Sequence, residues 1–232
     1  MPYKDKVWEI QPESPIPEGL NYDLWLGPAP DRPYCENLTH PQCWRQIEDF
    51  AAGTLTDWGM HLCDTATVAN FSEHTSPTLI EGIGVTPRNA MNSVPNKFDL
   101  TYVFANEVVM YVRSTGPSIR FEGSDGWCGN EGWCGELQAH DPSIFEETFT
   151  DNKMWELPPN EHRNFLDCVR KGAKPLYDVE TLHRLSTTLL TGSIAMKLRR
   201  PLEWDSEKEE FVDDEEANVM RTREASTEWE KA

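Results

Sequence analysis

Three ionisable side chains, Asp57, His61 and Asp64, are spaced four and then three residues apart in one stretch of the chain. A helix turns by about 100° per residue, so a helix here would place all three on one narrow face. An imidazole flanked by carboxylates can have its tautomer fixed and its pKa moved, as a general acid or base requires. A structural role also fits, because an acid in a first helical turn complements the helix dipole and a histidine can border a core. The spacing predicts a candidate acid–base site and leaves the structural interpretation open.

The helix that must carry these residues is predicted to begin at Thr56, as N-cap, and to end near Phe71. Next to the ionisable face runs an apolar stripe, which predicts that this helix packs on a core. The stripe consists of Leu55, Trp58, Leu62, Ala66 and Ala69.

Residues 98–104 alternate between apolar and polar side chains, which predicts a strand with one face covered by helices. The covered face is predicted to carry Phe98, Leu100, Tyr102 and Phe104. Residues 78–85, 108–114 and 119–122 also have strand character and are separated by short turns, which indicates an antiparallel meander. We therefore expect an α+β fold, with an open and mostly antiparallel β-sheet covered on one face by helices.

Two further helices are predicted after the strands. One covers 161–171, ends at Gly172, and is expected to face inward with Phe165, Leu166, Cys168 and Val169. The other covers 179–198, with Asp178 as N-cap and an apolar face that includes Leu182, Leu185, Leu189 and Met196. These helices are the expected cover of the sheet.

The two ends of the chain differ in composition from its middle. Residues 1–48 are rich in proline and lack periodicity, which predicts an extended arm. Residues 205–232 begin with a run of acidic side chains, which is typical of a solvated tail. The predicted α+β domain lies between them at 49–204, and the family resemblance described below implies that it serves substrate binding and oligomerisation.

A short tandem repeat, Gly-Trp-Cys-Gly, occurs at 126–129 and again at 132–135. Its two cysteines could form a metal clip with His140. The spacing matches no standard zinc pattern and no fourth ligand is evident, which favours a glycine-rich hairpin packed by its tryptophans. No metal site is predicted.

Acidic residues outnumber basic ones by 40 to 21, and the net charge is −19. Such a charge repels phosphate backbones and anionic lipid surfaces, so neither nucleic acid nor a membrane is predicted as a partner. The N-terminus has no apolar segment of signal-peptide length, and no later run reaches a membrane span. We expect a cytoplasmic protein whose six cysteines are free thiols.

The order of several motifs resembles the C-terminal domain of the Gfo/Idh/MocA family of glucose-fructose oxidoreductases and inositol dehydrogenases, in its bacterial and planctomycete branch. The matching stretches run in family order from near residue 20 to near residue 220. They are 21–30, 53–61 with Asp64, 121–123, 126–127, 164–170, 178–180 with His183 and Arg184, 202–205 and 216–218.

This resemblance implies oxidation or reduction of a sugar or polyol with NAD or NADP. In the family's pattern His61 would be the acid or base for the substrate hydroxyl and Asp57 its electrostatic partner, while Asp64 would be structural. The candidate substrate-binding neighbours are Trp25, His162, His183 and Arg184. The resemblance also implies a homo-oligomer formed through the sheet.

The chain departs from the family at its most important point. It contains neither the Gly-x-Gly-x-x-Gly turn nor the Glu-Lys-Pro lysine motif, so the Rossmann domain that binds the cofactor is absent and this chain has no predicted cofactor site. We do not expect it to transfer hydride alone, and a separate Rossmann-domain chain is an expected partner. Leu62, Leu182 and Leu185 also replace residues that the branch favours, which leaves the identity of the sugar open.

Two other functions fit the same residues. The chain could be a non-catalytic carbohydrate-binding or assembly module that keeps the sheet and its interface. It could also be a cofactor-independent or metal-assisted lyase or hydrolase, because Asp57, His61 and Asp64 offer oxygen and nitrogen ligands.

Overall fold

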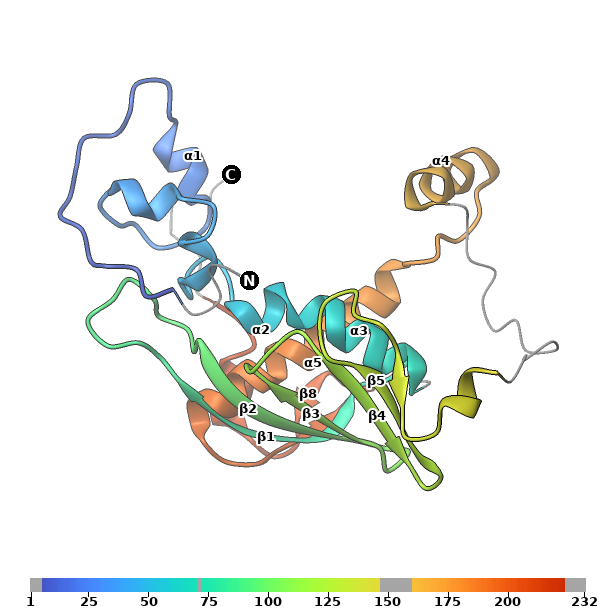
Figure 1. Cartoon of the computed structure of the whole chain (residues 1–232). Helices are drawn as coiled ribbons and strands as arrows, with labels where there is room; N and C mark the ends of the chain where they lie inside the picture. Colours follow the sequence, from blue (N-terminus) through green and yellow to red (C-terminus); the bar gives the residue numbers. More distant parts are fainter. Residues whose placement is uncertain (1–5, 71, 147–159, 224–232) are drawn as a thin grey trace.

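The computed structural model describes residues 6–70, 72–146 and 160–223. Its centre is a five-stranded sheet in which every strand pairs antiparallel with its neighbours, in the order β3-β2-β1-β7-β8 (Figure 1). The strands are β1 (Pro77–Val85), β2 (Lys97–Phe104), β3 (Val109–Arg113), β7 (Leu202–Asp205) and β8 (Glu210–Phe211). The expected α+β class with an open antiparallel sheet is confirmed.

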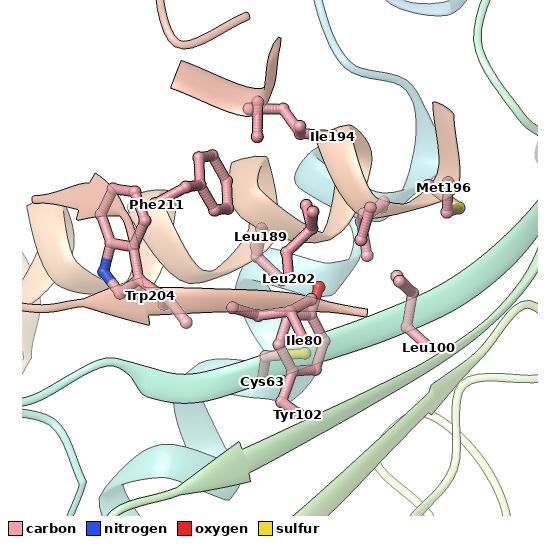
Figure 2. Close-up of a cluster of buried hydrophobic side chains, with 14 of the residues drawn as sticks. Cys63, Ile80, Leu100, Tyr102, Leu189, Ile194, Met196, Leu202, Trp204 and Phe211 are labelled. Carbon is pink, nitrogen blue, oxygen red and sulfur yellow. The ribbon is translucent and has the colours of Figure 1, made fainter. Parts of the chain in front are cut away.

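The period-two pattern of β2 is confirmed by the burial of its side chains. Leu100, Tyr102 and Phe104 are buried in the main core, and Phe98 is half-buried against it. The covering element is α5 (Val179–Leu198), whose N-cap Asp178 accepts a hydrogen bond from the Thr181 amide as predicted. Figure 2 shows the side chains of α5 and of the sheet meeting in this core.

The closest approach between helix and sheet is at Gly192 of α5. A Cβ atom at this position would overlap the hydroxyl of Tyr102, so only glycine allows the helix to lie this close. Before and after Gly192, the side chains of Leu185, Leu189 and Met196 are buried as predicted. Leu182, nearer the start of α5, is exposed. The side chain of Tyr102 is fully enclosed, and burial raises its pKa well above the usual value.

The predicted helix over 56–71 is present but interrupted. Helix α2 (Thr54–Asp57) begins three residues earlier than expected, with Gly53 rather than Thr56 as N-cap, and α3 (Gly59–Ala69) follows after a break at Trp58. Phe71 lies outside the described residues. The predicted stripe is only partly correct: Leu55 is buried, Trp58, Leu62 and Ala66 are half-buried, and Ala69 is exposed. The other buried positions of α2 and α3 are Thr54, Cys63 and Thr67.

The predicted meander divides into two sheets. A second sheet has the order β4-β5-β6, with β4 (Ile119–Gly123), β5 (Gly126–Asn130) and β6 (Gln138–Ala139). Strand β4 follows β3 closely in the chain but does not pair with it, and a short 3-10 helix, η3 (Pro142–Phe145), comes after β6. The glycine-rich repeat therefore forms β5 and the loop after it, as the hairpin prediction required.

The expected N-terminal arm is extended only at its start. Residues 6–20 form neither helix nor strand, whereas the next residues fold into α1 (Tyr22–Leu26), η1 (Glu36–Thr39) and η2 (Trp44–Gln46). Their side chains build a second, smaller core because the prolines are interspersed with large apolar residues. This core includes Trp8, Tyr22, Tyr34, Leu38 and Ile47.

The described part of the expected acidic tail is folded. Strand β8 and α6 (Glu215–Val219) bury Phe211 and Ala217, and Asn218 pairs through its side-chain amide with both the N–H and the C=O of Phe211, each at 2.8 Å. Arg200 binds Asp214 and Glu216, which places these acids in ion pairs rather than in solvent alone. Residues 224–232 of the expected tail lie outside the described part of the chain.

Helix α4 (Glu161–Lys171) has the predicted bounds and the predicted C-cap at Gly172, with φ of 63°. The prediction that its apolar face points inward is wrong: Phe165 is 65% exposed and Val169 is 68% exposed. Figure 1 shows α4 standing clear of the sheet and of α3. The reason is that α4 is amphipathic but has no partner among the described residues for its apolar face.

We predict that alanine substitution of two phenylalanines lowers the free energy of unfolding by very different amounts. Phe104→Ala removes a ring from the main core and should lower the free energy of unfolding by about 3 to 5 kcal/mol. Phe165→Ala should change it by less than about 0.5 kcal/mol, because that ring lies on the surface. Urea unfolding followed by circular dichroism measures both, and a large loss in Phe165→Ala would show that α4 is packed in solution.

Candidate functional site

His61 lies near the start of α3 and its side chain is exposed. Two indole rings flank it: the ring of Trp58 at a centroid distance of 5.5 Å and that of Trp133 at 5.6 Å. The two indoles also meet each other edge to face at 5.2 Å. The break between α2 and α3 puts Trp58 at this corner, while Trp133 comes from the loop between β5 and β6.

Asp57 is the last residue of α2, one residue before the break, and its carboxylate faces Arg45 of η2. The Oδ2 atom of Asp57 is 3.7 Å from Nη1 of Arg45, and both side chains are about one-third exposed. The ion pair holds the carboxylate at the surface beside the guanidinium of Arg45. Asp57 and His61 therefore lie on consecutive short helices rather than on one continuous face.

Asp64 lies one turn after His61, on the more buried side of α3. Burial raises the pKa of its carboxyl; the nearby His61 opposes this shift, and the carboxylate of Glu73 adds to it. Glu73 has a buried carboxylate oxygen, Oε2, with no hydrogen-bond partner among the described residues. Asp64 is thus coupled electrostatically to His61 and to a second acid.

The four candidate substrate-binding residues lie at separate places. Trp25 packs on Tyr22 and Phe50 in the small N-terminal core, and His162 is exposed on α4. On α5, Nε2 of His183 is 2.7 Å from Oε1 of Glu209, and Nη2 of Arg184 is 2.8 Å from Oε1 of Glu180. Figure 1 shows α1 and α4 at opposite ends of the α2–α3 layer. Within the described chain, none of the four forms a ring contact, hydrogen bond or ion pair with Asp57 or His61.

Two hollows adjoin α3. A small one of about 70 Å³ is apolar and is lined by Trp58, Leu62 and Phe98 among others. A larger cleft of about 620 Å³ lies between α3 and the facing edges of β3 and β4. Asp57 and His61 line neither hollow, so these two residues act, if at all, from an open surface next to the smaller one.

Neither a metal nor a membrane receives support from the described residues. No group of three His, Cys, Asp or Glu side chains in that part of the chain is arranged to hold a metal ion. Over the same residues, every helix is too short or too polar to cross a bilayer. The described cysteines are all free thiols.

Sequence reasoning missed part of this surface. The sequence predicts Trp58 on an apolar stripe and Trp133 in hairpin packing, and it gives no signal for Arg45. The tandem repeat is the one sequence feature that singles out Trp133. Two identical motifs need not place their tryptophans in the same environment, so the second copy could have been examined separately as a site residue. The helix break that brings Trp58 next to His61 has no signal in the periodicity.

We predict that Asp64 makes stability depend on pH in an unusual direction. Its folded pKa is raised above 3.8, so its contribution is fully present below about pH 3.8 and is lost as the pH rises through the folded value. Asp64→Asn removes this dependence, so the urea midpoint of the wild type, relative to the variant, should fall as the pH is raised from 4 to 7.

Asp178→Asn is the matched control. Lys174 and the Thr181 amide lower the pKa of Asp178 to about 2, so the stability it contributes is lost as the pH falls, the opposite direction. A pH-independent difference between wild type and Asp64→Asn would contradict the coupling of Asp64 to its buried surroundings.

Comparison with known proteins assigns the chain to a family. The C-terminal alpha/beta domain of the Gfo/Idh/MocA oxidoreductase family matches residues 6–231. No curated protein matches the chain in sequence. Among solved structures, an NAD-binding protein from Listeria innocua superposes with a TM-score of 0.52 at 15% identity, over 69% of this chain and 50% of that one.

Two further solved structures are similar but more distant. An aldose-aldose oxidoreductase from Caulobacter crescentus, complexed with glycerol, gives a TM-score of 0.48 at 14% identity, over 71% of this chain and 51% of that chain. A putative NADPH-dependent oxidoreductase from Desulfitobacterium hafniense gives 0.48 at 16%, over 69% and 50%. The chain spans about half the length of these structures. By the match over nearly its whole length, the chain belongs to the Gfo/Idh/MocA oxidoreductase family and corresponds to its C-terminal alpha/beta domain.

Proposed function

We propose that this chain is the substrate-binding and oligomerisation half of an NAD(P)-dependent oxidoreductase that acts on a sugar or polyol. The observation that carries the proposal is the exposed imidazole of His61 near the start of α3, after the Asp57–Arg45 ion pair at the end of α2, in a domain of this family. An exposed imidazole near a carboxylate can exchange a proton with a hydroxyl group, which oxidation of an alcohol or reduction of a carbonyl requires.

Each residue has a distinct part in the proposed site. His61 accepts the proton of a substrate hydroxyl at a ring nitrogen, or returns it in the reverse direction. Asp57, paired with Arg45 at the end of the preceding helix, is the proposed electrostatic partner of His61. Asp64 contacts no substrate in this proposal and acts on His61 through its charge.

The described residues do not fit a dinucleotide. All described strand pairs are antiparallel, and the part of the chain that the structure describes has no glycine-rich turn between a strand and a helix of a parallel unit. NAD or NADP, when bound, supplies the hydride acceptor or donor, and a second half must hold it. We derive no hydride step on this chain.

The uncovered apolar face of α4 supports a second half as partner. The chain spans about half of its solved relatives, and α4 presents Phe165, Leu166 and Val169 to solvent on the side of the sheet that α3 covers. A Rossmann domain seated over His61 would lie next to this helix and could bury its apolar side chains.

Trp25, His162, His183 and Arg184 stay predicted substrate contacts, and the proposal does not depend on them.

A non-catalytic carbohydrate-binding or assembly module is the second candidate function. It is favoured by the absence of a dinucleotide site among the described residues and by the large exposed sheet face described below. A lyase or hydrolase assisted by a metal has less support, since no group of donors in the described part of the chain is arranged for one. The two main candidates differ in whether His61 is needed for ligand binding.

We predict that His61→Leu abolishes sugar binding and leaves the fold intact, because the side chain is exposed and contributes little to the core. Saturation-transfer NMR with a panel of aldoses and polyols measures binding, and thermal unfolding measures stability. His74→Leu is the matched control, since it changes an exposed histidine in the turn before β1 that has no part in the proposed site. Unchanged binding in His61→Leu would remove His61 from the site and favour the assembly module.

The proposed oligomer forms through the open face of the large sheet. Ile83 is 65% exposed and Tyr111 is 60% exposed, and between them on β2 lie outward residues that no described helix covers. An ion pair at 3.1 Å joins Asp99 to Arg113 on the same face. A second copy covers this face of apolar side chains and paired charges by two-fold symmetry, and a stable interface of this kind buries roughly 800 Å² per partner.

We predict that the wild-type chain is a dimer of 26.6 kDa subunits and that Tyr111→Asp makes it monomeric, because a charge would be buried in the interface. Light scattering coupled to gel filtration measures the mass. Phe165→Asp is the control, as it adds the same charge on α4 and should leave the dimer unchanged. A monomeric wild type at micromolar concentration would refute the sheet interface.

A further inference from the structure

The aromatic corner formed by Trp58, His61 and Trp133 combines two segments that are far apart in the chain. The planes of Trp58 and Trp133 are almost perpendicular, at 87°, and that of His61 is inclined by 74° to Trp133. Two indole walls at a right angle, with an imidazole beside both, make a surface that is apolar on two sides and polar at one corner.

Trp133 stays half exposed although it contacts both other rings, with 51% of its surface accessible. Its loop is closed by a tight turn, in which the Gly135 amide donates to the Gly132 carbonyl at 2.9 Å and Cys134 adopts a left-handed φ of 56°. The Asn130 side chain also donates to the Gly135 carbonyl at 3.4 Å. A turn held in this way keeps the indole in place while leaving it open to solvent.

The first copy of the repeat provides a comparison. Trp127 lies within β5, is half-buried, and is covered by the guanidinium of Arg120 at 4.2 Å from the ring centroid. Trp127 therefore has a partner for its ring face within its own sheet, whereas Trp133 turns toward α3 and His61. Identical four-residue motifs thus place one tryptophan in the fold and the other at the candidate site.

We propose that Trp133 and Trp58 form a stacking site that receives the apolar face of a ring-form sugar and disfavours acyclic polyols. The inference rests on the proposed function and names the substrate class of the same site. A pyranose ring with equatorial hydroxyls presents its axial C–H groups as one flat apolar face, which an indole can cover. Its rim hydroxyls would then be within reach of the imidazole of His61, which borders both indoles.

An acyclic polyol lacks both advantages. Its C–H groups do not form one rigid face, and each rotatable bond that becomes fixed on binding costs conformational entropy. The corner therefore discriminates by shape and rigidity rather than by hydrogen-bond count. His61 contributes the polar contact, and Trp133 sets which molecules bring a hydroxyl to it.

The experiment compares methyl β-D-glucopyranoside with sorbitol as probes, using saturation-transfer NMR and tryptophan fluorescence on the purified chain. Wild type should bind the pyranoside more tightly than sorbitol. Trp133→Ala should weaken pyranoside binding by about tenfold, and Trp133→Phe should recover most of it because a ring is restored. Trp127→Ala is the matched control and should bind as wild type does.

The outcomes separate this inference from the proposed function. Pyranoside binding that is unchanged in Trp133→Ala, or equal affinity for sorbitol and pyranoside, overturns the stacking site while the His61 proposal stands. A wild-type chain that binds neither probe at millimolar concentrations overturns the proposed function and the stacking site together. An equal loss in Trp127→Ala and Trp133→Ala would mean that the hairpin acts only through folding and also overturns the inference.

Discussion

The packing of α5 across the large sheet is the constraint on which the rest of the structure depends. Gly192 allows the helix to approach the Tyr102 hydroxyl, and Leu189 and Ala195 fill the space on either side with no exposed surface. Because the interior is close-packed, the position of α5 cannot shift without opening a cavity. Helices α2 and α3 lie on this platform through Leu55 and Cys63, so the place of His61 follows from it.

The platform fixes α3 but not the direction in which its polar side chains point. That direction is set by the break at Trp58, which separates Asp57 from His61 and turns an indole toward the imidazole. An uninterrupted helix would instead have aligned both carboxylates with His61 on one face. Because of this interruption, Asp57, His61 and Asp64 do not share one helix face. His61 instead contacts the two indoles, and Asp57 pairs with Arg45.

Residue periodicity was sufficient for the parts of the fold that bury one face. The alternation in β2 and the N-cap Asp178 of α5 were both readable, since each reflects a local physical requirement. The same rules failed for α4, because an amphipathic pattern shows that a face will be buried but not whether its partner lies in the same chain. They also missed the separation of β4 from β3, which depends on non-local pairing. For the candidate site, the motif order pointed to Asp57 and His61, while the contact of Trp133 with His61 required the fold.

Three surfaces with large apolar side chains stay open to solvent on the described part of the chain. The open sheet face carries Ile83 and Tyr111, α4 carries Phe165, and the candidate site carries Trp133. A single partner cannot cover the sheet face and α4 together, because the helical layer lies between them (Figure 1). Exposed apolar area of this extent is costly in a chain that acts alone, and a charge of −19 would keep such a chain soluble without burying it. In the proposed function, the sheet face serves a second copy, α4 a cofactor-binding half, and Trp133 a small ligand. Each of the three surfaces then has its own binding partner, whereas a module that only binds a small ligand would need just one of these surfaces.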